Sequence, residues 1–175
     1  ESRHNPSFPV IKKIGPEWPQ AEQDREMAQF EPQNPNYDVE VRHRFRQQPY
    51  NLSIGAEVID VKPGRVEIVV PSRADLIQHN GYFHGGLIAG LADIAGGFAG
   101  WSLVDEDQGM LTIEYKLNIV APGIGQELRA VGEVVSRGRS IIVTRIDVFG
   151  SKDGAPVLCA TSLQTLKVMK PPPEL

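Results

Sequence analysis

The sequence predicts an α+β fold in which one long helix is wrapped by a curved antiparallel sheet of about six strands. Two observations predict this fold. A nearly uncharged run at residues 84–104 is long enough for a helix that is covered on most sides. Segments of strand-like alternation flank it, two before the run and four after it. One helix and a sheet of that size can share a core only if the sheet curls around the helix.

The composition is that of a globular domain with one core. The chain has 175 residues, of which 41% are hydrophobic and 23% are charged. Its net charge of -4 gives no electrostatic reason to expect a nucleic acid partner. The single cysteine, Cys159, excludes an internal disulfide and lies in an apolar strand-like run, so we expect an inert buried thiol. The four histidines form no metal-binding pair, and we expect neither a metal nor a bound cofactor.

The proline distribution sets the expected domain boundaries. We expect an N-terminal arm at residues 1–36, one folded domain at 37–170 and a tail at 171–175. Prolines are dense in the arm, where they block helix and sheet interiors, so the arm either wraps over the body or a partner subunit, or is disordered. The sequence starts with glutamate rather than methionine, which favours a trimmed or processed start. We expect a cytoplasmic protein without membrane association, or one in an organellar matrix if the N-terminus is processed.

The first elements of the domain are a helix and a hairpin. Tyr37–Gln48 is expected to be an amphipathic helix, because Tyr37, Val41 and Phe45 repeat at four-residue spacing. A hairpin of Ile54–Val61 and Arg65–Val70 follows, and then a polar loop at Pro71–Asn80.

The long helix contains one charged residue. From Gly85 to Val104 only Asp93 is charged, and a carboxylate in so apolar a helix is costly unless it is paired or used. A transmembrane helix would have this length, but the mid-span Asp93, the lack of a second apolar span and the strands that follow disfavour it. The other alternative is a core helix whose Asp93 is merely hydrogen-bonded.

Four strands in a meander are expected after the helix. In the first, Leu111–Val120, strict alternation puts one set of residues on a wetter face and the other set opposite: Thr112, Glu114, Lys116 and Asn118 against Leu111, Ile113, Tyr115, Leu117 and Ile119. The later strands are expected at Glu127–Ser136, Ser140–Phe149 and Ala155–Met169. Such a sheet leaves open edges, which pairing with a second copy would bury.

The start of the long helix can hold an anionic oxygen. Gly85 lies where the helix is expected to begin, so its N–H is one of the unpaired donors and the helix dipole adds positive charge there. Because Gly85 and Gly86 lack side chains, a substrate can approach the backbone, although tight packing alone is the alternative reason for them. His84 is expected to cap or brace the loop, and a purely structural role remains open.

Several ordered motifs resemble one family of enzymes. The segment from 81 to 95 contains Gly-x-x-His-Gly-Gly at Gly81–Gly86 and Leu-Ala-Asp-x-Ala at Leu91–Ala95. The strand of Leu111–Ile119, the turn of Ala121–Gly123 and the run Ala160–Thr165 also fit. Over about residues 40–169 the chain resembles the hotdog-fold acyl-CoA thioesterases of the phenylacetyl-CoA thioesterase-like (PaaI-type) branch.

The resemblance implies roles for individual residues. Gly85 falls on the position whose N–H polarises the thioester carbonyl, and Asp93 on the catalytic base or nucleophile. Thr112 falls on a position that often helps to place the water. Many members carry Asn six residues before the motif histidine. Here that residue is Gln78, and Asn80 lies four before it, so these two are the candidates for the polar contact of the loop.

Two further groups are candidates for substrate binding. Tyr82, Phe83 and Phe98 could line an acyl pocket together with Gly86, although aromatic residues at such spacings can equally be core. The turn Arg137-Gly138-Arg139 looks like the Gly-Arg turn of the family and could meet the CoA phosphates, although a merely solvated turn is equally open.

The expected activity is hydrolysis of an acyl-CoA or aryl-CoA thioester, with CoA as part of the substrate. A non-catalytic acyl-CoA-binding or sensing module on the same fold is the alternative, and a hotdog dehydratase would want an Asp/His pair that the loop lacks. Gly85 and Asp93 are eight residues apart on one helix, about 12 Å along its axis. We therefore expect a homodimer whose two active sites are shared between chains, with a dimer of dimers as a further arrangement.

Overall fold

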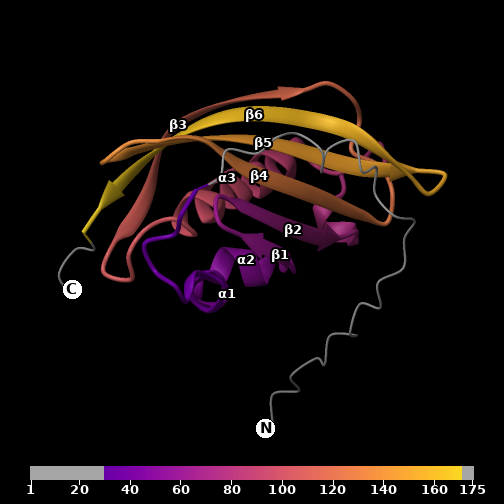
Figure 1. Ribbon diagram of the computed structural model, residues 1–175. Coiled ribbons are helices and arrows are strands. Elements are labelled where there is room, and N and C mark those ends of the chain that lie inside the picture. Colours follow the sequence, from indigo (N-terminus) through magenta and orange to yellow (C-terminus); the bar gives the residue numbers. More distant parts are fainter. Residues whose placement is uncertain (1–29, 171–175) are drawn as a thin grey trace, which may run out of the picture.

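A computed structural model describes residues 30–170 of the chain (Figure 1). The predicted tail and nearly all of the predicted arm therefore lie outside the described residues. Helices α1 (Tyr37–Gln47), α2 (Pro49–Ser53) and α3 (Gly85–Trp101) are joined by strands β1 (Glu57–Lys62) and β2 (Arg65–Pro71) and a short 3-10 turn at Ala74–Leu76. Strands β3 (Gly109–Ile119), β4 (Glu127–Arg137), β5 (Ile141–Lys152) and β6 (Ala155–Met169) follow α3.

The six strands form one antiparallel sheet. Its order is β1-β2-β4-β5-β6-β3, so β1 and β3 are the edge strands. Figure 1 shows β4, β5, β6 and β3 arching over α3, with α1 and α2 below them. The predicted α+β fold, a curved sheet of six strands around one long helix, is confirmed.

Glycine lets the sheet approach the helix closely. A Cβ at Gly132 of β4 would overlap the carbonyl oxygen of Ala95, so the two backbones touch there. On the helix, a Cβ at Gly100 would lie 2.6 Å from Leu166 Cδ1. Replacing these glycines would force helix and sheet apart, because a packed core has no spare volume.

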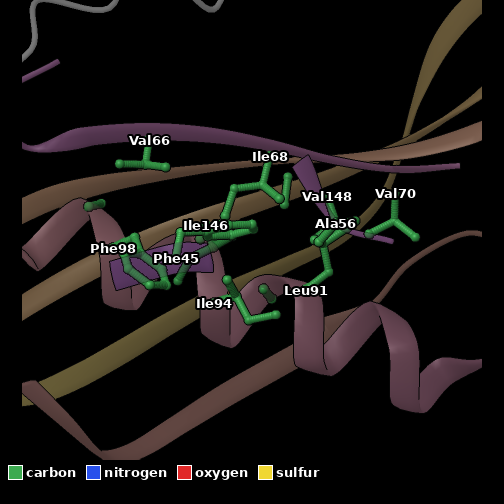
Figure 2. Close-up of a cluster of buried hydrophobic side chains, with 14 of the residues drawn as sticks. Phe45, Ala56, Val66, Ile68, Val70, Leu91, Ile94, Phe98, Ile146 and Val148 are labelled. Carbon is green, nitrogen blue, oxygen red and sulfur yellow. The ribbon is translucent and has the colours of Figure 1, made fainter. Parts of the chain in front are cut away.

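One core joins all the elements. Leu91, Ala92, Ala95 and Ala99 of α3 are fully buried, and Ile68 and Ile146 of the sheet face them. The ring centroids of Phe45 (α1) and Phe98 (α3) are 5.3 Å apart, so α1 is fixed against the helix (Figure 2). Burial of this kind contributes about 25 cal/mol per Å² of apolar surface and is the main stabilising term.

The first half of the domain differs from its prediction at two places. The helix expected at 37–48 ends at Gln47, and a second helix, α2, begins at Pro49, where proline is tolerated in the first turn. Residues 54–56 therefore lead into β1 instead of belonging to it. The loop after β2 is polar as expected but anchors Leu76, which is 9% exposed, in the core.

The alternation predicted for β3 is wrong at its start. Between Thr112 and Glu114 the register with β6 shifts, so Ile113 is an extra residue. Thr112 is paired with buried Leu166 and faces the helix, whereas Leu111 is paired with Lys167 on the other face. A bulge of this kind reverses the faces on one side of it, which simple alternation cannot show.

Strand β3 is an exposed apolar edge. Leu111, Ile113 and Ile119 are 59%, 55% and 51% exposed, and the strand is 11 residues long. An uncovered edge of that length is a template for pairing with another chain.

No helix within residues 30–170 has both the length and the apolar character needed to cross a membrane.

Candidate active site

The N-terminus of α3 presents one free backbone donor. His84 is the N-cap, and its Nδ1 accepts a hydrogen bond from the Gly86 N–H at 3.0 Å. The N–H groups of Leu87 and Ile88 donate to the His84 carbonyl at 3.0 and 3.1 Å. Of the four donors that a helix start leaves open, only the Gly85 N–H finds no acceptor within residues 30–170. His84 therefore caps the helix, and the Gly85 N–H, at the positive end of the helix dipole, is placed to bind an anionic oxygen.

The loop before α3 folds back on itself. Gly81 has φ of +80°, and its N–H donates to the Gln78 carbonyl at 2.9 Å. The Gln78 N–H donates to the Tyr82 carbonyl at 2.8 Å, and Asn80 lies exposed in the turn. The structure therefore holds Gln78 and Asn80 in the loop that leads into the helix start. In the part of the chain that the structure describes, neither side chain hydrogen-bonds to Asp93.

Asp93 lies half-buried on α3 in polar surroundings. Its Oδ1 accepts hydrogen bonds from Thr112 Oγ1 at 2.7 Å and from Gln164 Nε2 at 2.6 Å. The helix around Asp93 is apolar as expected, but β3 and β6 each direct one polar side chain at the carboxylate, so Asp93 is paired. The predicted candidates Asp93 and Thr112 are brought together within one chain.

Gln164 is a contact of Asp93 that the sequence analysis missed. The strand at 155–169 was predicted, and its alternation places Gln164 on the same face as Leu166 and Val168. A buried amide must find hydrogen-bond partners. The position of Gln164 in the alternation of this strand was therefore a signal in the sequence that could have identified it.

The exposed face of α3 is a strip of small residues around Asp93. It contains exposed Gly86 and half-buried Gly90 and Gly97, and a Cβ at Gly97 would meet nothing within 4 Å. A Cβ at Gly90 would lie 2.5 Å from Tyr50 Oη, so the phenol of α2 rests on the helix one turn before Asp93. Tyr50 is 50% exposed and was not predicted as a site residue.

One chain does not bring Gly85 and Asp93 together. Both residues lie on the continuous helix α3, so they remain about 12 Å apart along its axis. Gly85 neighbours the far end of β3, because its Cβ would lie 3.5 Å from Ile119 Cδ1. Thr112, near the start of β3, contacts Asp93, so β3 runs antiparallel along α3 from one candidate to the other.

Two of the aromatic candidates belong to the core. Phe83 and Phe98 are each 2% exposed, and Phe98 stacks with Trp101 at a centroid distance of 5.5 Å. The structure therefore favours, for Phe83 and Phe98, the alternative that these aromatic residues are part of the core. Tyr82 is 39% exposed next to the helix start and remains a candidate for the pocket.

The turn Arg137-Gly138-Arg139 lines a cavity of about 370 Å³ with Val104 and Gln108. This cavity lies beyond the C-terminal end of α3, whereas Gly85 lies at the other end of a helix of 17 residues, roughly 25 Å long. The turn and Gly85 of one chain are therefore not part of one site.

Within residues 30–170, three side chains have a pKa shifted from the ordinary value, those of Arg73, Asp75 and Cys159, and none of them contacts Asp93. The guanidinium of Arg73, which donates hydrogen bonds to Asp75, holds the pKa of that exposed carboxyl below its ordinary value. Burial raises the pKa of the Cys159 thiol to about 11, which confirms the prediction of an inert buried thiol. Residues 30–170 contain no group of three or more His, Cys, Asp or Glu side chains placed to hold a metal ion.

The fold and the helix-start motif define a family. The chain belongs to the thioesterase superfamily, which matches residues 80–157, and it has the hotdog fold. It is 33% identical to a thioesterase family protein of Silicibacter pomeroyi, whose crystal structure superimposes with a TM-score of 0.75 over 77% of this chain and 99% of that one. The resemblance to hotdog-fold thioesterases that the motifs indicated is confirmed.

Two further relatives are similar to this chain. A protein of Saccharolobus solfataricus that bears the provisional name of an esterase is 30% identical over 101 residues, which cover 58% of this chain and 71% of the relative. The PaaI protein of Escherichia coli, from the phenylacetic acid degradation operon, shares the fold at 16% identity, with a TM-score of 0.68 over 77% of this chain and 94% of that one.

Proposed function

We propose that the chain hydrolyses an acyl-CoA or aryl-CoA thioester to the free acid and CoA. Superfamily membership supports thioester hydrolysis in general. One observation supports the specific chemistry: the glycine-rich helix α3 carries both an unpaired N–H at Gly85 and a carboxylate on its exposed face at Asp93.

In the proposed reaction, the Gly85 N–H and the helix dipole polarise the thioester carbonyl and stabilise the oxyanion that forms on it. Asp93 takes a proton from water, whose oxygen attacks the carbonyl carbon; direct attack by the carboxylate is the alternative route. Collapse of the intermediate breaks the C–S bond, and the CoA thiolate leaves and takes up a proton. Thr112 holds one carboxylate oxygen and helps to place the water.

The proposed site is shared between two chains. A carbonyl held at Gly85 needs its attacking group about 3–3.5 Å away, and Asp93 of the same helix is about 12 Å distant along the axis. Thr112 marks the Asp93 end of β3 and Ile119 marks the Gly85 end. Antiparallel pairing of two β3 strands about an axis near Tyr115 and Lys116 would place Asp93 of one copy beside Gly85 of the other.

Two features support this pairing. Strand β3 is an edge strand with exposed apolar side chains, and pairing would cover them. The open glycine strip of α3 allows two helices to approach closely. A two-fold axis gives two equivalent sites, and a dimer of dimers would repeat the arrangement.

The Arg137–Arg139 turn has a place in the same dimer. It lies beyond the C-terminal end of α3, about two helical turns past Asp93. In an antiparallel pair, the copy that supplies Asp93 would therefore also bring its Arg137–Arg139 turn toward the substrate at Gly85 of the other copy. Guanidinium groups bind phosphate bidentately, which suits the nucleotide end of CoA.

The test is thiol release from a panel of acyl- and aryl-CoA esters by the parent and by Asp93→Asn. We expect the parent to hydrolyse at least one ester and the variant to lose about 10²–10⁴ in kcat while still binding the ester. A parent that binds acyl-CoA without hydrolysing any ester would establish the alternative, a binding or sensing module. Parental rates in Asp93→Asn would make the carboxylate structural.

A further inference from the structure

Gln164 is a fully buried amide whose NH2 group donates only to residues of the proposed site. It is 0% exposed on β6, where Ser162 and Leu166 are its neighbours on the same buried face. Its Nε2 donates to Asp93 Oδ1 at 2.6 Å, to Thr112 Oγ1 at 3.0 Å and to the Asp93 carbonyl at 3.3 Å. Its Oε1 accepts from Thr144 Oγ1 of β5 at 3.1 Å. A buried amide persists in a core only when it is satisfied in this way.

The two ends of the amide are not interchangeable. A carboxylate only accepts hydrogen bonds, so the NH2 end of Gln164 must face Asp93. The carbonyl end then faces Thr144, whose hydroxyl can donate to it. Thr144 therefore holds the carbonyl end of Gln164. Gln164 of β6 and Thr112 of β3 in turn hold Asp93 Oδ1.

The helix leaves room for this arrangement at one position. A Cβ at Gly96 would overlap Gln164 Oε1 and lie 2.7 Å from Thr144 Oγ1. The side chain of Gln164 reaches Asp93 because α3 has no side chain at Gly96. Residues of three elements, α3, β5 and β6, therefore pack together in one hydrogen-bonded cluster.

The second carboxylate oxygen is left available. Both side-chain donors, Thr112 and Gln164, bind Oδ1, and Oδ2 has no hydrogen-bond partner among the described residues 30–170. From this geometry we infer that Gln164 is a positioning residue: it holds Oδ1 so that Oδ2 points to the water or carbonyl carbon. This inference rests on the proposed function, in which Asp93 is the catalytic carboxylate.

The matched variants are Gln164→Met, which keeps the size of the side chain but removes the amide, and Ser162→Ala. Ser162 lies two residues away on the same buried face of β6, and its Oγ has no hydrogen-bond partner among the described residues. We expect Gln164→Met to lower kcat about 10–100-fold with KM changed less than about twofold, because a misplaced reacting group affects the chemical step. Ser162→Ala should keep the parental kcat. Thr144→Val should lower kcat by a smaller factor, again with KM nearly unchanged. If Gln164→Met does not fold, Thr144→Val is the variant that tests the positioning role.

The readout that separates positioning from structure is the double variant. If Gln164 acts through Asp93, then Gln164→Met should cause no further loss in an Asp93→Asn background. An equal loss in both backgrounds, or parental kcat in both Gln164→Met and Thr144→Val, would overturn the inference. Parental activity of Asp93→Asn would instead overturn the proposed catalytic role of Asp93, so the two failures are distinguishable.

Discussion

Gly96 links the stability of the core to the geometry of the site. In Gly96→Ala the new Cβ would overlap Gln164 Oε1 and lie 2.7 Å from Ile146 Cδ1 and Thr144 Oγ1. Overpacking of this kind costs about 1–3 kcal/mol, and displacing Gln164 from its buried partners costs about 1–3 kcal/mol more. The better helix propensity of alanine offsets about 1 kcal/mol. We therefore expect the free energy of unfolding to fall by about 3 kcal/mol.

The assay is urea unfolding followed by circular dichroism, with thiol release measured on the same samples. Gly97→Ala is the matched control, because Gly97 is the next residue of the same helix and a Cβ there meets nothing within 4 Å among residues 30–170. The control should be as stable as the parent or up to about 1 kcal/mol more stable. If Gly96→Ala were as stable and as active as the parent, the close packing of Gly96 against Gln164 would be wrong.

Three other predictions follow from the same structure. Replacing Arg137 and Arg139 by Ala should raise KM for acyl-CoA about tenfold, flatten its salt dependence and leave kcat little changed, and an unchanged KM would remove the turn from the site. Tyr50→Ala should raise kcat/KM about tenfold for bulkier acyl groups relative to smaller ones, since it uncovers the strip at Gly90, whereas Tyr50→Phe should not. Burial raises the pKa of the Cys159 thiol from 9.0 to about 11, so between these pH values the folded state keeps a proton that the unfolded state loses. The free energy of unfolding should therefore fall as the pH rises from about 9 to about 11. Cys159→Ala should show no such pH dependence.

Local patterns were sufficient to predict the architecture and the start of the helix. The apolar run with its single Asp93, and the alternating segments around it, predict the wrapped sheet because a continuous apolar run and a two-residue alternation can both be read directly from the sequence. The free donor at Gly85 was predictable because every helix start leaves N–H groups open. The second helix was missed because a proline commonly ends a helix, whereas here Pro49 begins the next one.

Contacts that depend on register could not be predicted in the same way. The bulge at Ile113 turns Thr112 toward the helix, and its presence is set by pairing with β6. The Gln164–Asp93 contact joins positions 71 residues apart, so it appears only once β6 is placed over α3. The position of Arg137 at the opposite end of α3 from Gly85 also depends on how the strands cross the helix.

The shared active site is the central claim, and subunit complementation tests it most directly. Asp93→Asn removes the carboxylate, and Gly85→Leu blocks the approach to the free N–H, so each homodimer should be inactive in thiol release. After subunit exchange, a mixed dimer should contain one site with both parts intact and recover up to about half of the parental activity per dimer, because symmetry gives two sites. Verified mixed dimers without recovered activity, or an active monomer at the assay concentration, would contradict the account.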